Sequence, residues 1–181
     1  NFINDNGEVD GFEKDVGDML CIRANLDCVW VINEWDSIIP NLVSGNYDTI
    51  IAGMSITDER DKVIDFTQDY YPPSPSYYVG MAGQSIDVKG GVIAAQTATI
   101  QAGFVAESGA TLVEFATPDE TIQAVRNGEA DAVLADGDYL MPIVDESNGE
   151  LAVVGQESIG GGIGRDSSSL AVAPLPAFDF G

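Results

Sequence analysis

The sequence predicts an α/β protein built from two similar lobes, and two observations support this. First, apolar segments typical of strands alternate with segments typical of helices, which favours parallel strands joined by helical crossovers. Second, residues 41–53 resemble residues 123–136. In both, a helix stops at a glycine, an aspartate follows three residues later, and an apolar strand breaks five residues after that. The repeat predicts that each lobe presents a strand end to a shared cleft.

The composition excludes several classes of function. With 30 acidic and 7 basic residues the net charge is -23, which argues against nucleic acid or an anionic membrane surface as a partner. This charge serves solubility first, and it suits a cationic or zwitterionic small molecule second. The chain has no histidine, which excludes Ser-His-Asp catalysis and the common histidine metal sites. No apolar run approaches the roughly 20 residues that span a bilayer, and no signal-peptide pattern opens the chain.

The first part of the chain predicts a hairpin followed by a helix. Turn residues at 4–7 lie between two short strand-like segments, which is typical of a hairpin. Residues 12–24 then predict a helix whose apolar face carries Val16, Met19, Leu20 and the aliphatic stem of Arg23.

Cys21 and Cys28 allow two interpretations of the end of this helix. On one straight helix they would stand about 10.5 Å apart, too far for a disulfide. A helix that ends near Asn25 and turns back would let them pair. We expect the disulfide, and with it an oxidising compartment, over two buried thiols.

The next segments continue the alternation of strand and helix. Residues 28–32 predict an apolar strand. Asp36 is placed to cap a helix over 37–44 that ends at Gly45. Residues 48–53 predict a buried strand.

The loop that follows this strand, from Gly53 to Arg60, is the first candidate for a binding site, because ligands of α/β sheets sit beyond the carboxyl ends of the strands. A helical turn at 58–62 and an apolar segment at 63–66 come next. Prolines within 72–75 then break regular structure and predict a crossing between lobes. The expected domains are lobe 1 at 1–73 and lobe 2 at 74–160, followed by an irregular tail within 161–181.

Lobe 2 repeats the alternation. Thr117 and Glu120 form a capping box that predicts the start of a helix ending at Gly128. Strands are predicted at 77–81, 92–95, 111–115 and 131–135, and helices at 99–108 and 117–128.

Two side chains, one from each lobe, are the best candidates to bind a ligand. The guanidinium of Arg60 presents paired donors to a carboxylate, and the carboxylate of Asp136 can accept from an ammonium group. Further candidates are Gly53 and Ser55 in the loop, Thr99 at a helix start, and Trp35 as a flat apolar wall or cation–π face.

The same residues also have plainer explanations. Arg60 could pair with Asp58 or Asp61 at the surface. Trp35 could belong to the core, and Asp136 could cap a helix over 137–142.

Four segments resemble a known family. Residues 7–20, 35–71, 96–101 and 128–136 are similar, in order and spacing, to the extracellular solute-binding proteins, family 3, of bacterial ABC uptake systems. The motif SITDER followed by DFT is the most specific part. The resemblance implies a two-lobe, type II periplasmic-binding fold that closes on a polar L-amino acid without any cofactor. It also implies crossings between the lobes near 71–74 and near 159–164, so that 161–181 would hold the return crossing and an irregular tail.

The resemblance also implies a role for each candidate. Arg60, helped by Ser55 and Thr99, would bind the ligand α-carboxylate. Asp136 and the carbonyl of Gly53 would bind its α-ammonium, and Trp35 would contact its side chain. Residues 20–28 resemble the histidine and lysine/arginine/ornithine binders, which carry a disulfide there. The net charge and this cysteine loop favour a basic ligand.

The expected protein is a periplasmic or secreted monomer that hands its ligand to an ABC permease in the membrane. In the family, the first strand would precede the position of Asn1. The family also has a strand and C-terminal helices that complete lobe 1, and here residues 165–181 stand in their place. We therefore expect a fold that is N- and C-terminally incomplete. Ala94 and Ala98 stand where the family usually has glycine.

Two other functions are known on the same scaffold. An enzyme resembling cyclohexadienyl or arogenate dehydratase would need an Asp or Glu as general acid, because histidine is absent. A sensor domain of a receptor would need a neighbouring membrane span in the full gene. We expect a binding protein over both, although a fold alone does not decide function.

Overall fold

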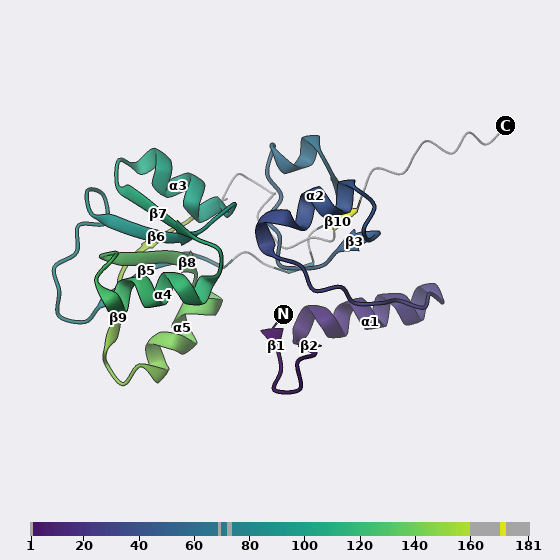
Figure 1. Ribbon diagram of the computed structural model, residues 1–181, viewed down its shortest axis with the longest axis horizontal. Coiled ribbons are helices and arrows are strands. Elements are labelled where there is room, and N and C mark those ends of the chain that lie inside the picture. Colours follow the sequence, from purple (N-terminus) through teal and green to yellow (C-terminus); the bar gives the residue numbers. More distant parts are fainter. Residues whose placement is uncertain (1, 69, 72–73, 160–170, 173–181) are drawn as a thin grey trace. The chain divides into compact units, whose positions relative to one another are not determined.

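The structure, a computed structural model, describes residues 2–68, 70–71, 74–159 and 171–172. These residues form two compact units. Unit 1 holds the described residues up to 71 together with 171–172, and unit 2 holds 74–159. Each unit contains strands and helices (Figure 1), so the predicted α/β class is confirmed.

Unit 1 begins with the hairpin and helix that the sequence predicts. Strands β1 (Phe2–Ile3) and β2 (Val9–Asp10) pair antiparallel. Helix α1 runs over Phe12–Ala24. Both elements are specified by local signals, the turn residues between the strands and the left-handed residue after the helix.

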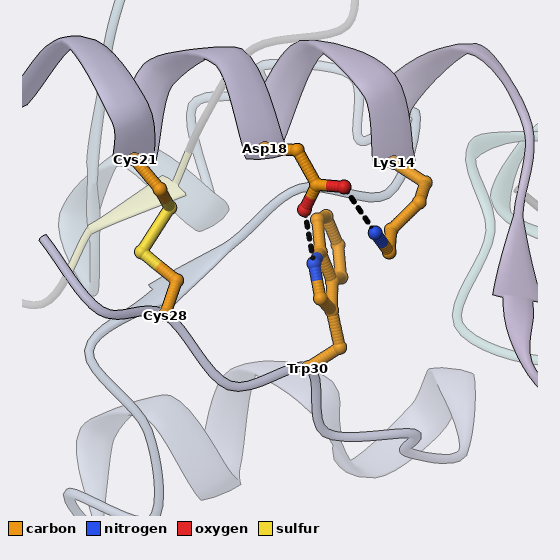
Figure 2. Close-up of a disulfide and its surroundings, with 5 residues drawn as sticks. All are labelled: Lys14, Asp18, Cys21, Cys28 and Trp30. Atoms are coloured by element: carbon orange, nitrogen blue, oxygen red, sulfur yellow. Dashed lines mark hydrogen bonds and ion pairs between the residues drawn. A yellow bond between two sulfur atoms is a disulfide. The ribbon is translucent and has the colours of Figure 1, made fainter.

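The end of α1 brings the two cysteines together. Asn25 adopts the left-handed conformation, with φ 53°, and the chain turns back there. Cys21 and Cys28 form the expected disulfide, with their Cα atoms 6.1 Å apart (Figure 2). The prediction of a bridge over two thiols is therefore confirmed.

The buried side of α1 differs from the predicted apolar face. Its buried residues are Glu13 and Gly17, whereas Met19 and Leu20 are 54% and 47% exposed. The indole of Trp30 lies against Gly17, where a Cβ atom would come within 2.6 Å of the ring. The helix therefore packs by its backbone against an aromatic ring, a contact that the spacing of apolar side chains does not reveal.

The strand predicted at 28–32 does not form. Among the described strands none pairs with this segment, and a strand is held by the hydrogen bonds of its neighbour. Val29 is 85% exposed. The segment is instead tied to α1 by the disulfide at Cys28 and by Trp30, whose Nε1 donates to Oδ1 of Asp18 at 2.8 Å (Figure 2). It borders an apolar cavity of about 440 Å³ that α1 and the hairpin also line.

The helix predicted over 37–44 forms, but Asp36 does not cap it. A 3-10 turn, η1 (Trp35–Ser37), contains Asp36 and leads directly into α2 (Ile38–Val43). Neither element has a side-chain cap at its start. Gly45, with φ 74°, ends the segment as predicted.

The sheet of unit 1 is antiparallel, so the parallel arrangement predicted there is wrong. Strand β10 (Ala171–Val172) lies between β3 (Thr49–Ile50) and β4 (Asp65–Phe66) and pairs antiparallel with both. The described strand β3 is shorter than the one predicted at 48–53. Apart from β10, the tail predicted at 161–181 lies outside the described residues. The buried core of unit 1 consists of Leu42, Ile50, Met54 and Ile64.

Unit 2 is a five-stranded sheet with the order β7-β6-β8-β5-β9. Its strands are β5 (Ser76–Met81), β6 (Val92–Gln96), β7 (Thr111–Phe115), β8 (Ala132–Asp136) and β9 (Leu151–Glu157). Strand β6 is parallel to β7 and β8, as predicted, whereas β5 is antiparallel to β8 and β9. The sequence did not predict β9.

Helices cover both faces of this sheet. Helix α3 (Ile100–Ser108) lies on one face, and α4 (Pro118–Asn127) and α5 (Gly137–Glu146) lie on the other (Figure 1). Because side chains alternate along a strand, neighbouring residues serve different cores. One core contains Tyr78, Ile93, Val105 and Leu134, and the other contains Val79, Ala94, Val133 and Leu140.

The signals that begin and end α4 act as predicted. The backbone N–H of Thr117 donates to Oε2 of Glu120 at 2.9 Å, and the N–H of Glu120 donates to Oγ1 of Thr117 at 3.4 Å. This is the expected capping box. Gly128 ends the helix with φ 76°, close to the 74° of Gly45 in the matching segment of unit 1. Asp131 then accepts from the N–H of Val92 at 2.8 Å, which ties the start of β8 to β6.

Candidate functional site

The candidate loop of unit 1 is anchored at its first residue. Gly53 has φ 59°, and its N–H donates to Oε1 of Glu13 at 2.6 Å. The hydroxyl of Tyr70 donates to the same oxygen at 2.5 Å. Burial, together with this hydrogen bond, raises the pKa of Tyr70 above its ordinary value. Glu13 is only 8% exposed, so a buried carboxylate on α1 holds the loop; the sequence analysis did not identify it.

Arg60 lies at the other end of this loop and opens the 3-10 turn η2 (Arg60–Lys62). Its Nη1 donates to the carbonyl oxygen of Ser55 at 2.8 Å. Its backbone N–H donates to Oγ1 of Thr57 at 3.2 Å. Burial lowers the pKa of Arg60, yet an arginine remains charged because its ordinary pKa is far above neutral. The loop therefore presents an oriented guanidinium.

Trp35 takes part in the core, which is the plainer of its two interpretations, and its ring also faces Arg60. Its half-buried side chain packs against the apolar core of unit 1. The guanidinium carbon of Arg60 lies 5.7 Å from the centre of its ring, which is within cation–π range. The structure thus brings Trp35, Ser55 and Arg60 together within unit 1.

In unit 2, Thr99 occupies the N-cap position of α3. Its Oγ1 accepts from the N–H of Ala102 at 3.1 Å and donates to the carbonyl of Gln96 at 2.7 Å. The hydroxyl is therefore used to begin the helix. The preceding residue, Ala98, has φ 57°, a left-handed conformation that a glycine would adopt without strain.

Asp136 is the last residue of β8, at the N-cap position of α5. Its side chain makes no cap bond, so the interpretation of Asp136 as a helix cap is wrong. Its Oδ1 accepts instead from Nε2 of Gln101 at 2.7 Å. The same Nε2 donates to Oγ of Ser76 at 3.0 Å. Gln101 and Ser76 are buried, and the sequence did not single out either of them. The position of Gln101 just inside a helix start was the only local signal.

The surroundings of Asp136 shift its pKa upward. The main cause of the raised pKa is that nearby protein atoms remove part of the hydration of the carboxylate. The residue nevertheless keeps part of its surface exposed. The hydrogen bond from Gln101 opposes the shift, and the charge of Asp138 adds to it. The carboxylate of Asp136 is therefore partly exposed but less hydrated than a free one, and none of the groups that shift its pKa is a cation. A positive ligand group could bind beside it without displacing another cation of this set.

In the part of the chain that the structure describes, no group of cysteine, aspartate and glutamate side chains is arranged to hold a metal ion. No helix within those residues has the length and apolar character needed to cross a membrane.

Comparison with known sequences identifies a family that resembles this chain. A profile of the bacterial extracellular solute-binding proteins, family 3, matches residues 1–101. The L-arginine-binding protein of Pseudomonas aeruginosa is 35% identical over 139 residues, which are 72% of this chain and 53% of that protein. The probable histidine-binding protein of Campylobacter jejuni is 32% identical over 166 residues, 89% of this chain and 64% of that protein. The chain thus spans about half to two thirds of these relatives.

Solved structures extend the likeness to the fold. A periplasmic His/Glu/Gln/Arg/opine family-binding protein from Silicibacter pomeroyi, in complex with lysine, is 64% identical with a TM-score of 0.89. The match covers 97% of this chain and 78% of that one. An ancestral arginine-binding protein bound to arginine is 27% identical with a TM-score of 0.85, and the match covers 96% of this chain and 79% of that one.

Proposed function

This chain belongs to the bacterial extracellular solute-binding proteins, family 3, and we propose that it binds a basic L-amino acid and delivers it to the permease of an ABC transporter. The observation that carries the proposal is the 64% identity, over 97% of the chain, to a periplasmic binding protein in complex with lysine. The names of two relatives refer to arginine and histidine binding. The protein acts in the periplasm or outside the cell, as a monomeric binding protein and not as an enzyme.

We assign the ligand α-carboxylate to Arg60. A guanidinium has five N–H donors in one plane. The bond from Nη1 to the Ser55 carbonyl uses one donor and orients that plane. Paired N–H groups can then bind both oxygens of a carboxylate, which is the strongest arrangement for this pair. The hydroxyl of Thr99 is used in capping, so we assign to the carboxylate its backbone N–H at the start of α3.

We assign the ligand α-ammonium to Asp136, with the carbonyl of Gly53 as a second acceptor. An ammonium group offers three donors and no acceptor. It gains most from a carboxylate that is poorly hydrated, because the attraction between opposite charges grows as water is excluded. The raised pKa of Asp136 reflects such an environment.

The side chain of the ligand is assigned to the neighbourhood of Trp35. An indole ring accepts both an apolar stem and a cation over its face. The net charge of -23 adds a long-range preference for a ligand with a second positive charge. Arginine, lysine, ornithine and histidine share this chemistry.

Isothermal titration with the twenty L-amino acids and ornithine tests the proposal on the whole chain. We expect heat of binding with one or more basic amino acids and none with aspartate or glutamate. D-arginine is the matched control, because a site that binds both the α-carboxylate and the α-ammonium distinguishes the two enantiomers. Absence of binding by every amino acid would contradict the proposed function, and a preference for acidic ligands would contradict the assignment to basic ones.

A further inference from the structure

A buried amide connects the candidate ammonium site to the framework of unit 2. Gln101, on the first turn of α3, is 5% exposed. Its Nε2 carries two N–H groups, and both have acceptors: Oγ of Ser76 at 3.0 Å and Oδ1 of Asp136 at 2.7 Å. One amide nitrogen therefore joins α3 to β5 and to the end of β8.

The strand register makes this connection rigid. Ser76 on β5 lies directly opposite Asp136 on β8. Gln101 donates to both members of this cross-strand pair. A side chain held by two hydrogen bonds in a buried position has little rotational freedom, so the carboxylate that it contacts is held as well. Ser76 is itself fully buried, which keeps water out of the junction.

We propose that Gln101 is a positioning residue for ligand binding, which fixes Oδ1 of Asp136 so that Oδ2 is directed to the ligand ammonium. The proposal rests on the function proposed above. The alternative is that Gln101 is only a satisfied polar residue of the core, in which case Asp136 would bind a ligand equally well without it.

The charges around Asp136 give the proposal a pH signature. Gln101 stabilises the ionised carboxylate, whereas loss of hydration and the charge of Asp138 on α5 disfavour it. Glu157 on β9 stands at the register position beside Ser76, so it adds negative charge on the other side of β5. Removal of the amide N–H therefore raises the pKa of Asp136 further. Because an ammonium binds the ionised form, the loss of affinity in acid then begins at a higher pH.

The test replaces Gln101 by Met, which keeps the length of the side chain and removes its donors. Gln123, an exposed residue on α4, is replaced by Met as the matched control. Two quantities are measured on the whole chain: the pKa of Asp136 without ligand, from the 13C shift of its carboxyl carbon, and the affinity for L-arginine and L-lysine against pH. If the Met variant does not fold, Gln101→Asn supplies the same measurements, because the shorter amide cannot span the 2.7 Å contact.

We expect the Gln101 variant to raise the pKa of Asp136, to weaken binding about tenfold at neutral pH, and to move the acid midpoint of binding upward. Gln123→Met should change none of these. An unchanged pKa of Asp136, or a uniform loss of affinity at every pH, would overturn the inference. If the unmodified chain binds no amino acid, the proposed function fails; if it binds and the Gln101 variant binds equally well, only the positioning role fails.

Discussion

At the scale of single residues, the candidate groups are held by partners far away in the sequence. Glu13 on α1 binds the N–H of Gly53, 40 positions later. Gln101 binds Asp136, 35 positions later. In both cases a buried polar side chain determines where a binding group stands, because leaving either polar partner unpaired would cost about 1–3 kcal/mol.

Arg60→Ala tests the carboxylate assignment. We expect the variant to lose amino-acid binding by a factor of at least about a hundred, since a charge-assisted pair of hydrogen bonds disappears. Arg126→Ala is the control, because Arg126 forms an ion pair with Glu150 on the surface of unit 2. Isothermal titration measures both variants. Equal affinity of Arg60→Ala and the unmodified chain would show that another group binds the carboxylate.

Asp136→Asn tests the ammonium assignment and separates binding from stability. Asn keeps an oxygen for the hydrogen bond from Gln101 but loses the charge. Binding should be lost, while the melting temperature without ligand should stay equal or rise. Folding raises the pKa of the Asp136 carboxyl group. The ionised carboxylate therefore disfavours the folded state at pH values above the ordinary pKa of aspartate. Exposed Asp145→Asn serves as control; a lower melting temperature for Asp136→Asn alone would contradict this reasoning.

At the scale of elements, a small cluster of contacts ties the segment after α1 to that helix. Lys14 forms an ion pair with Asp18, and Nε1 of Trp30 donates to the same carboxylate (Figure 2). These bonds, first that from Lys14, hold the pKa of Asp18 below its ordinary value. Their stabilisation is present above the ordinary pKa and is lost as pH falls through the lowered one. The disulfide completes the attachment of the segment after α1.

Removal of the disulfide should destabilise unit 1. Closing the short loop between Cys21 and Cys28 restricts the unfolded chain, and the expected contribution is about 2–3 kcal/mol. We predict a lower melting temperature for the double variant Cys21→Ser/Cys28→Ser, measured by circular dichroism. A reducing agent should lower the melting temperature of the unmodified chain to a similar value and leave the double variant unchanged. No response to reduction would mean that the bridge does not form in solution.

Ala98→Gly should stabilise unit 2. The left-handed conformation of Ala98 costs about 1 kcal/mol relative to glycine at the same φ. This gain exceeds the extra freedom that glycine brings to the unfolded chain, so the net effect is a small increase in unfolding free energy. Denaturant titration measures it, with Ala116→Gly as a control at another exposed loop position. A loss of stability in Ala98→Gly equal to that in the control would contradict the argument.

At the scale of the whole molecule, the net charge of -23 dominates. Such an excess of like charge favours solubility and disfavours the compact state. The negative charge also attracts cations from solution. Salt screens this attraction, and the screening length is about 10 Å at 0.1 M ionic strength. The acidic character that argues against nucleic acid as a partner is therefore the same property that suits the proposed basic ligand.

Salt should consequently stabilise the folded chain. Raising sodium chloride from about 10 mM to about 0.5 M screens repulsion among the acidic side chains, so the melting temperature should increase. Sodium chloride is used for this experiment and not a sulfate salt, because sulfate is excluded from protein surfaces and would stabilise the fold by that second mechanism too. A control at pH near the sequence pI of 4.1 should respond much less. A melting temperature that falls with sodium chloride at pH 7 would contradict the role assigned to net charge.

The sequence by itself determined the features that depend on neighbouring residues. The capping box of Thr117 and Glu120, the end of α1 at Asn25 and the stop at Gly128 all appear where local patterns predicted them. Tertiary structure decided the rest. A strand needs a partner that its own residues do not specify, which is why the one predicted at 28–32 is absent from the described sheets and β9 was not predicted.

The candidate site divides in the same way. The residue types in the loop after β3 and at the end of β8 could be recognised from spacing and resemblance, because guanidinium and carboxylate chemistry is local to one side chain. The contacts that orient them could not. Glu13 with Gly53, and Gln101 with Asp136, meet only when separate elements pack, and burial then makes each polar pair obligatory.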